Sequence, residues 1–445
     1  MIKQSRIWQF RLDPSDIGES EHWERQEFTQ TIEIPGILQA QGYGDKITKN
    51  TEWVQSLYDR RWYDREEYRV WEKLADAADG REIPVPFLCQ PPRHYTGKAW
   101  YRTTFCVKGE KNGWFYRLFM ECTRWKTTAW VDGIRKGSAM GLCAPHEIDL
   151  GCMTAGEHVL TVCVDNGWQL PYRPDGHGVS DALGVTWNGM VGAVVLQEKP
   201  PVELHRMELY PDAGTMCVRV KLTVENHTDQ RQNVGISVCP VCHKNLCEHG
   251  DNIDWDTEWK TEQVWAEPGP NYFERMVFYP QDTLRWDEFT PHLERIAAKV
   301  TAEDILEADF GFRTAETKDG LFQINGRPTY FRGTHFGGDY PETGYPRTDA
   351  AFWDNMMQVL KKWGLNFIRM HSYCPPEAAF EAADRAGMAR RWDNSLQGSL
   401  HPEVLEAAIV PPKVQPQAFL FSRLSCAAGC AAMILYFVRS FLSGS

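Results

Sequence analysis

Hydrophobic residues follow one period as far as about residue 313 and another period beyond it. Before that point, short runs of β-branched and aromatic residues alternate with polar ones, and Pro200-Pro201 divides these runs into two blocks. Beyond it, short apolar runs alternate with helical patterns. Alternating polarity predicts half-buried strands, whereas strands that alternate with helices predict a parallel sheet. The sequence therefore predicts two mainly β domains, residues 1–200 and 201–312, followed by the start of a β/α domain.

The first block carries strand-like runs every 10–15 residues or so and no helical periodicity, which indicates a jelly roll or related sandwich. Asp132-Gly133 follows one of these runs and is a dipeptide that favours a tight hairpin turn. Strands are expected at Ala99–Val107, Trp114–Glu121, Thr127–Val131 and His158–Val164.

The second block is about the size of an immunoglobulin-like sandwich and contains only short strand patterns. Met216–Val224 alternates most regularly, because every second residue in it is apolar. Further strands are expected at Asn233–Val238, Gln263–Ala266 and Arg295–Val300.

The third segment, residues 313–388, predicts β/α units. Strands are expected at Leu321–Asn325, Pro328–Arg332 and Asn366–His371, with a turn at Asn325-Gly326. One helix should bury the face formed by Phe352, Met356, Val359, Leu360 and Trp363, with Thr348 or Asp349 as its cap and Gly364 at its end. A second helix should begin at Pro375-Pro376-Glu377 and end by Gly387. Strand, helix, strand and helix in succession favour a doubly wound sheet or a TIM barrel.

Residues 389–445 show no continuing β/α alternation and are expected to form a tail unrelated to the segment before it, disordered or frame-shifted. The apolar run Leu424–Val438 is shorter than the ~20 residues that span a bilayer, so no membrane partner is expected. The first ten residues, MIKQSRIWQF, have no apolar core of the kind that directs export. A cytoplasmic location is therefore expected, with the 13 cysteines mostly reduced.

Composition narrows the classes of partner. The formal net charge of −12 argues against a nucleic-acid-binding protein, which needs a basic surface to meet phosphates. The chain contains 18 tryptophans, whose broad apolar faces suit both sandwich cores and the C–H faces of sugars. Composition therefore permits carbohydrate recognition without requiring it.

Seven stretches, in order along residues 1–388, resemble one known family. They are IPGILQAQGYGD (34–45), VPFLCQPPRHYTGKAWYRTTF (85–105), RWKTTAWVDG (124–133), APHEIDLG (144–151), WNGMVGAVVL (187–196), INGRPTYFRGTH (324–335) and NFIRMHSYCPPEAAFEAADRAG (366–387). The chain resembles glycoside hydrolase family 2, the family of β-galactosidases and β-glucuronidases. The resemblance implies a sugar-binding jelly roll, an immunoglobulin-like sandwich and a TIM barrel, with no cofactor.

The chemistry implied by this resemblance is retaining hydrolysis of β-linked sugars by two glutamates, one acting as acid/base and one as nucleophile. In the family the acid/base follows an asparagine, and the chain contains no Asn-Glu dipeptide. Residues 313–445 are also about half the ~250 residues of a typical barrel. The sequence therefore predicts an incomplete barrel without catalytic residues, in a truncated or frame-shifted chain that is an inactive fragment.

The chain is still expected to contain some substrate-binding residues. The resemblance gives Arg369 the role of holding a catalytic carboxylate in its ionised form. His371 lies near the same strand end and is expected to donate to a sugar hydroxyl, although it follows the arginine by two positions and the family's histidine follows it by three. The resemblance also places Arg332 and His335 just after the first barrel strand, where the family lines its pocket. Trp187 either reaches the sugar, together with Asn188, or fills the sandwich core. The alternative for Arg332 and His335 is that they are loop residues that form only local hydrogen bonds.

Two alternatives stay open. The chain could be a non-catalytic carbohydrate-binding protein that uses its jelly roll. It could instead be a structural scaffold in which Cys239, Cys242, Cys247 and His249 bind zinc, since their spacing suits a tetrahedral site, although incidental loop thiols would give the same pattern. The aromatic and acidic run Trp53–Trp71 is expected to form a surface excursion of the first domain, and it could contact a second copy of the chain in a homo-oligomer.

Overall fold

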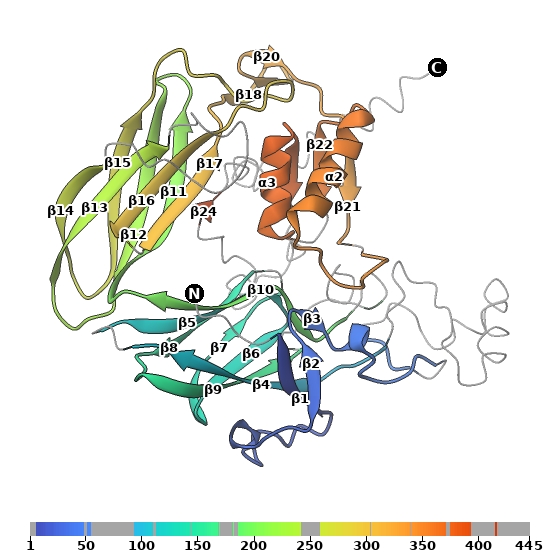
Figure 1. The fold of residues 1–445 in the computed structure, drawn as a ribbon. Helices are drawn as coiled ribbons and strands as arrows, with labels where there is room; N and C mark the ends of the chain where they lie inside the picture. Colours follow the sequence, from blue (N-terminus) through green and yellow to red (C-terminus); the bar gives the residue numbers. More distant parts are fainter. Residues whose placement is uncertain are drawn as a thin grey trace, which may run out of the picture.

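The computed structural model describes residues 6–48, 51–54, 93–109, 113–142, 144–167, 169, 181, 186–241, 259–302, 304–338, 340–370, 374–392 and 414–415. Two β-sandwiches and a small β/α unit make up this part of the chain (Figure 1). The prediction of a mainly β, multidomain protein is confirmed. No helix among these residues is both long enough and apolar enough to cross a membrane.

The first sandwich packs a six-stranded antiparallel sheet against a four-stranded one. The larger sheet has the order β2 (Gln30–Glu33), β1 (Ile7–Asp13), β4 (Lys98–Val107), β9 (Gly156–Asp165), β6 (Lys126–Val131) and β7 (Ile134–Met140). The smaller has the order β3 (Gly36–Ile37), β10 (Gly189–Lys199), β5 (Phe115–Thr123) and β8 (His146–Gly151). Two short 3-10 helices, η1 (Trp23–Arg25) and η2 (Gln39–Gln41), lie in its loops.

The expected hairpin at Asp132-Gly133 joins β6 to β7. Both residues have positive φ, 51° at Asp132 and 75° at Gly133, which are the dihedrals that a two-residue turn of this hand requires. The main core of the sandwich lies between the two sheets and includes Trp8, Tyr101 and Leu118. A second buried apolar cluster contains Trp23, Trp100 and Trp130, so several of the tryptophans lie in the interior of this domain.

The second sandwich follows the Pro200-Pro201 boundary and has the seven core strands of an immunoglobulin-like fold in two sheets. One sheet has the order β15 (Gly269–Phe278), β12 (Cys217–Asn226), β11 (Val202–Asp212) and β24 (Val414–Gln415), in which β24 is a short parallel addition. The other has the order β14 (Lys260–Ala266), β13 (Gln232–Val241), β16 (Glu294–Thr301) and β17 (Asp304–Phe310). Every second residue of β12 faces the core, as its alternation predicted.

The β/α unit begins with a small antiparallel sheet of β18 (Ala315–Lys318), β19 (Leu321–Ile324) and β20 (Arg327–Pro328). A parallel sheet follows, formed by β21 (Gly333–Phe336), β22 (Phe367–Met370) and β23 (Ala389–Trp392). Two helices connect its strands, α2 (Ala350–Lys362) and α3 (Glu377–Arg385). As predicted, Asp349 caps α2 by accepting a hydrogen bond from the Phe352 amide, at 3.0 Å.

Three details of this unit differ from the sequence predictions. The strand expected at Pro328–Arg332 is confined to β20, and the first parallel strand starts only at Gly333. The β/α pattern does not end at Met388, because Ala389–Trp392 adds a third parallel strand. The buried face of α2 is rotated from the expected one: Trp353 and Met357 are fully buried against β22, whereas Trp363 is 80% exposed.

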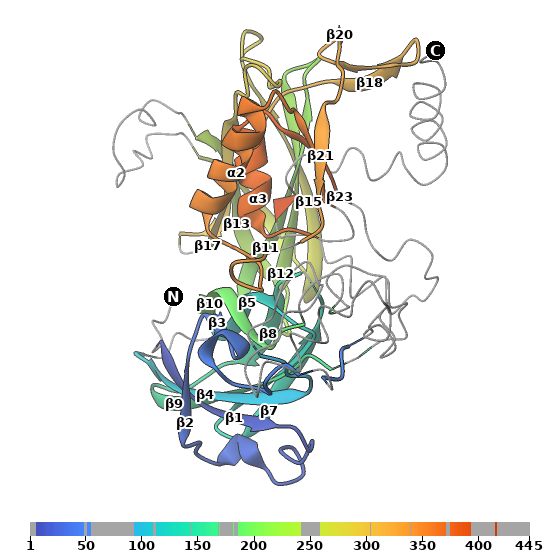
Figure 2. The ribbon, with the colours of Figure 1, turned by 90° about the vertical axis from the view of Figure 1, so that its right-hand side faces the viewer.

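The three units contact one another. Trp286 lies in the loop between β15 and β16, and its indole donates to the Asp384 carbonyl of α3 at 2.8 Å, which joins the second sandwich to the β/α unit. The first sandwich contacts the same unit through Tyr345, whose ring packs against an apolar cluster that contains Trp187. Figure 2 shows the first sandwich at one end of the molecule, with the helices beside the second sandwich.

Candidate functional site

Two of the predicted site residues lie on the face of the parallel sheet that points away from α2 and α3, which is named the inner face. β21 and β22 pair in register, with His335 opposite Arg369. Ile368 and Met370 of β22 are buried against the two helices. Because side chains alternate between the faces of a strand, Arg369 lies on the face away from the helices, and its register partner His335 shares that face. In a closed β/α barrel this face is the interior. His335 lies within the first parallel strand, not after it as predicted.

The carboxyl ends of these strands face the first sandwich (Figure 1). After β21, the chain passes through residues 337–349 before α2 begins, and this loop contacts the first sandwich at two points. The Tyr345 ring packs on the cluster of Ile37, Cys122, Trp187 and Val191. Thr348 Cγ2 lies 3.0 Å from where a Cβ on Gly192 would stand, so glycine is required for this close approach. Sites in β/α folds are built at these strand ends, and here the first sandwich forms their boundary.

The first sandwich brings a cation and a carboxylate to this boundary. The Arg124 guanidinium lies over the Trp187 ring, 4.9 Å from its centroid, and Arg124 is 7% exposed. One oxygen of Glu121 accepts a hydrogen bond from the Ala193 amide at 2.8 Å, and burial raises the pKa of this carboxyl. Sequence reasoning did not single out Arg124 or Glu121. Arg124 begins one of the quoted motifs and Trp187 begins another. Nothing local in the sequence indicates that the two side chains meet.

Arg332 lies at the opposite end of the sheet. It precedes β21, and its guanidinium donates to the carbonyls of Gly364 at 2.7 Å and Tyr330 at 3.2 Å. It also pairs with the Glu288 carboxylate at 3.0 Å, which ties the β/α unit to the second sandwich. These contacts engage Arg332 at the amino ends of the strands. The structure therefore brings His335 and Arg369 together and keeps Arg332 apart from them.

Asn188 is a core residue, contrary to the expectation that it reaches a sugar. Its side-chain nitrogen donates to the carbonyls of Gly97 at 3.0 Å and Val164 at 2.9 Å, and its side-chain oxygen accepts from the Tyr101 hydroxyl at 2.8 Å. It is 0% exposed. With its amide buried and engaged in this way, Asn188 has no free surface for a ligand. Trp187 is also buried, which agrees with the alternative that it fills the core.

The remaining candidates lie wholly or partly outside the described residues. His371 is not described. Of the four residues proposed for zinc, only Cys239 is described, and it is buried on β13; Cys242, Cys247 and His249 lie outside. Among the residues that the structure describes, no group of three or more His, Cys, Asp or Glu side chains is arranged to hold a metal ion. Zinc binding by the cysteine cluster stays a prediction.

Comparison with known proteins connects this geometry to a family. No family model matches the chain. A β-galactosidase from Pectobacterium atrosepticum is 24% identical over 401 residues, which cover 86% of this chain and 34% of that protein. A β-glucuronidase from Paenibacillus borealis is 23% identical over 408 residues, covering 86% of this chain and 57% of that protein. The chain thus spans about a third of the length of the first of these relatives.

Solved structures agree with these sequence matches. A family 2 β-galacturonidase from Eisenbergiella tayi, solved with galacturonate bound, superimposes with a TM-score of 0.61 and 18% identity, over 88% of this chain and 58% of that one. This chain folds like the N-terminal part of a glycoside hydrolase family 2 enzyme. The family 2 architecture explains the order of the units, since a jelly roll and an immunoglobulin-like sandwich precede the β/α unit.

Within this family 2 fold, the Asn-x-x-Arg signature divides into a structural and an outward-facing residue. Asn366 is buried, its side-chain oxygen accepts from the Arg332 amide at 2.8 Å, and its side-chain nitrogen donates to the Tyr330 carbonyl at 3.0 Å. It therefore fixes the start of β21 against β22. Arg369, three residues later, lies farther along β22 on the inner face.

Proposed function

We propose that this chain is the sugar-binding, N-terminal part of a family 2 glycosidase that acts on β-linked sugars. One observation carries the proposal: Arg369 and His335 share the inner face of a parallel sheet whose carboxyl ends face the Arg124–Trp187 contact of the first sandwich. A guanidinium and an imidazole offer hydrogen-bond donors to sugar oxygens, and guanidinium also pairs with carboxylates.

We infer the class of sugar from the names of the similar proteins and from two arginine side chains. The names of the similar proteins include β-galactosidase, β-glucuronidase and β-galacturonidase, so their substrates range from neutral hexosides to hexuronides. We propose a terminal β-linked galactose or hexuronic acid as the ligand. Two arginines near the strand ends, Arg369 and Arg124, favour a sugar that carries a carboxylate, because bidentate pairing with guanidinium adds to its binding energy.

Hydrolysis of aryl β-galactosides and aryl β-glucuronides by the purified chain is expected to stay at the rate of a buffer control. The reason is chemical: retaining hydrolysis needs two carboxylates about 5–5.5 Å apart, and the chain holds no Asn-Glu pair of the kind in which the family resemblance places the acid/base. Release of the chromophore, followed over hours at high protein concentration, checks this. Rates clearly above the control would sink the proposal that this chain is inactive by itself.

A second candidate function is binding of carbohydrate without catalysis. The missing Asn-Glu pair favours it, since binding needs only the Arg369 face and the first sandwich. Calorimetric titration with galactose, glucuronate and galacturonate separates the cases. Saturable heat without hydrolysis supports a binding protein or a binding fragment, and absence of heat with all three sugars contradicts both.

Arg369→Ala is expected to weaken binding of the preferred sugar at least tenfold, because one charge-assisted hydrogen bond contributes about 1.5–3 kcal/mol. Arg332→Ala is the matched control. The family resemblance placed both arginines among the substrate-binding residues, but Arg332 is engaged by Glu288 and Gly364 at the other end of the sheet. Its loss should leave the dissociation constant unchanged while lowering stability. Equal effects of the two variants on binding would contradict the assignment of the inner face as the site.

A further inference from the structure

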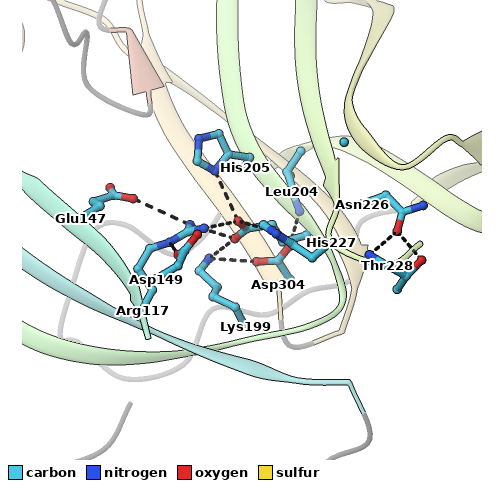
Figure 3. A network of polar contacts seen from close by, with 12 residues as sticks. Arg117, Glu147, Asp149, Lys199, Leu204, His205, Asn226, His227, Thr228 and Asp304 are labelled. Atoms are coloured by element: carbon cyan, nitrogen blue, oxygen red, sulfur yellow. Dashed lines mark hydrogen bonds and ion pairs between the residues drawn. The ribbon is translucent and has the colours of Figure 1, made fainter. Parts of the chain in front are cut away.

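The second sandwich contacts both of its neighbours and leaves one of its sides outside these contacts. Towards the first sandwich, Glu203 of β11 is fully buried, with Arg117 of β5 at 2.7 Å and Lys199 of β10 at 3.2 Å from its carboxylate oxygens (Figure 3). Towards the β/α unit, Trp286 donates to the Asp384 carbonyl. Figure 1 shows the end strands β14 and β15 on the side of this sandwich that points away from the helices. This side, named the β14–β15 flank, takes no part in the proposed sugar site.

The strand β15 carries three large apolar side chains on its outer surface. Tyr272, Met276 and Phe278 are 77%, 54% and 71% exposed. They alternate with the partly buried Phe273 and Val277, which pack on the core of the sandwich, so all three point to the same side of the strand. Single exposed apolar residues are common on protein surfaces, whereas a row of them along one strand is typical of a surface that contacts another protein.

The outer edge of β15 also presents backbone hydrogen-bonding groups. Among the described residues β15 is the end strand of its sheet, and it pairs along its whole length with β12. Directly after β15, the Tyr279 amide donates to the Met216 carbonyl on the β12 side. In an antiparallel strand the N–H and C=O groups of successive residues point to opposite sides. The odd-numbered residues of β15 therefore bond to β12, and the even-numbered ones from Tyr272 to Phe278 point their backbone groups to the outer edge.

Little in the sequence of β15 protects this edge from pairing with another strand. Edge strands are usually protected by charged side chains, by proline or by shortness. β15 is ten residues long, has its proline, Pro270, at the second position, and exposes a single charged side chain, Glu274. By contrast β14, the end strand of the other sheet, exposes Lys260 and Glu262. The edge of β15 is therefore the part of the β14–β15 flank that is suited to strand pairing.

We propose that two copies of this chain dimerise by pairing their β15 strands antiparallel about a two-fold axis, which joins the two four-stranded sheets into one continuous sheet. The partner is a second copy because β15 complements itself in one register. In that register Tyr272 lies opposite Phe278 of the partner subunit, and Glu274 lies opposite Met276 of the partner subunit. Each of these facing pairs exchanges two backbone hydrogen bonds through groups that point to the outer edge.

The neighbouring registers are less favourable. A shift of the pairing in one direction places Glu274 opposite Glu274 of the partner subunit, and like charges directly opposite each other destabilise a strand pair. A shift in the other direction places Pro280 opposite Tyr272, and proline has no N–H to donate to the ladder. The proposed register avoids both problems and puts the apolar side chains of the two copies in one continuous row.

The size of the β14–β15 flank and its charges suit such a dimer. Ten strand residues extend over ~34 Å, and two stacked sheets with their side chains are roughly 20 Å wide, so each copy offers on the order of 700 Å². This is close to the ~800 Å² per partner of a standard stable interface. On the other face of β15, Arg275 lies near the axis and is paired with Glu262 of its own chain at 3.0 Å. Glu274 is likewise paired with Arg219 of its own chain at 3.8 Å.

Sedimentation velocity of the full chain, over about a hundredfold range of protein concentration, tests for the dimer, because mass action makes its population depend on concentration. The net charge of −12 opposes association of two copies, so the measurement is made at ~0.15 M salt, where the screening length is about 8 Å. We expect a reversible equilibrium between monomer and dimer. A monomer at every concentration overturns the proposal.

Two variants of Met276 test the register. Met276→Glu places a carboxylate opposite Glu274 of the partner subunit, at two symmetric positions in each dimer, and should raise the dissociation constant at least about tenfold. Met276→Lys removes the same apolar group but places an ammonium opposite that carboxylate, so its dissociation constant should stay within about threefold of wild type. Arg219 of β12 faces Met276 within one chain, so the folded monomer tolerates glutamate at least as well as lysine. Equal dissociation constants for the two variants overturn the proposal.

Hydrogen exchange gives a second measurement that needs only the wild type, in case a variant fails to fold. The amides of the even-numbered residues from Tyr272 to Phe278 should become more protected as the protein concentration rises. The amides of Phe273 and Val277, which point towards β12, should change much less. No increase at the even-numbered residues, or the same increase at both sets, overturns the proposal. None of these measurements involves a sugar, so they are independent of the proposed function.

Discussion

Replacing Glu203 by glutamine is expected to lower the free energy of unfolding by about 3–5 kcal/mol. The change keeps the volume of the side chain and removes its charge. Arg117, which is 4% exposed, then loses the buried carboxylate that it contacts with two nitrogens. Arg117 keeps the Asp149 carboxylate, which is 50% exposed, but it loses its fully buried counter-charge, and this accounts for most of the expected loss. Urea unfolding at pH 7, followed by tryptophan fluorescence, measures the difference.

Glu274→Gln is the control for this prediction. Glu274 lies on β15 of the same sandwich and pairs with Arg219 at 3.8 Å, with both side chains nearly half exposed. A surface pair of this kind contributes about 0–1 kcal/mol. If Glu203→Gln costs no more than Glu274→Gln, then the contacts of Glu203 with Arg117 and Lys199 do not hold the two sandwiches together.

Acid should remove the difference between wild type and Glu203→Gln. Hydrogen bonds from His205 and His227, together with the charges of Arg117 and Lys199, outweigh desolvation and hold the pKa of Glu203 far below its ordinary value. A depressed pKa in the folded state contributes stability above the unfolded-state pKa of about 4.3 and loses it progressively below that value. The two proteins should therefore differ fully above about pH 5 and converge as the pH falls towards 2.

The sequence predicted those parts of the fold that depend on neighbours along the chain. The alternation of Met216–Val224, the turn at Asp132-Gly133 and the cap at Asp349 each rest on residues within one element, and each is confirmed. The helix face of α2 was missed by about one residue, because Phe352 and Trp353 are both aromatic and only packing against β22 decides which is buried.

Contacts between distant residues could not be predicted in this way. Arg117 and Glu203 are separated by 86 residues, and their individual positions show only a charged residue within a strand pattern. The same holds for the candidate site, where Arg124 meets Trp187. Arg332 gives the reverse case, since its place beside the first parallel strand suggested a pocket residue. Only the direction of β21 shows that it lies at the other end of the sheet.

Trp187→Ala is expected to lower the free energy of unfolding by about 3–5 kcal/mol, because it empties the centre of a buried cluster. Trp187 is 1% exposed and packs with Ile37, Cys122 and Val191. Trp265→Ala serves as the control. Trp265 is 52% exposed on β14 and holds Arg231 over its ring, so its loss should cost less than about 1 kcal/mol. Thermal or urea unfolding of the two variants checks the contrast.

Trp187→Phe decides between the two roles considered for this tryptophan. The indole nitrogen is buried and has no hydrogen-bond partner among the described residues, so phenylalanine loses packing volume but no hydrogen bond. We expect a cost of about 1–2 kcal/mol, well below that of alanine. A residue that only fills the core should leave the affinity for sugar unchanged once the variant is folded. A folded Trp187→Phe protein that binds sugar tenfold more weakly would instead place Trp187 in the binding surface, with Arg124 held over its ring for the same purpose.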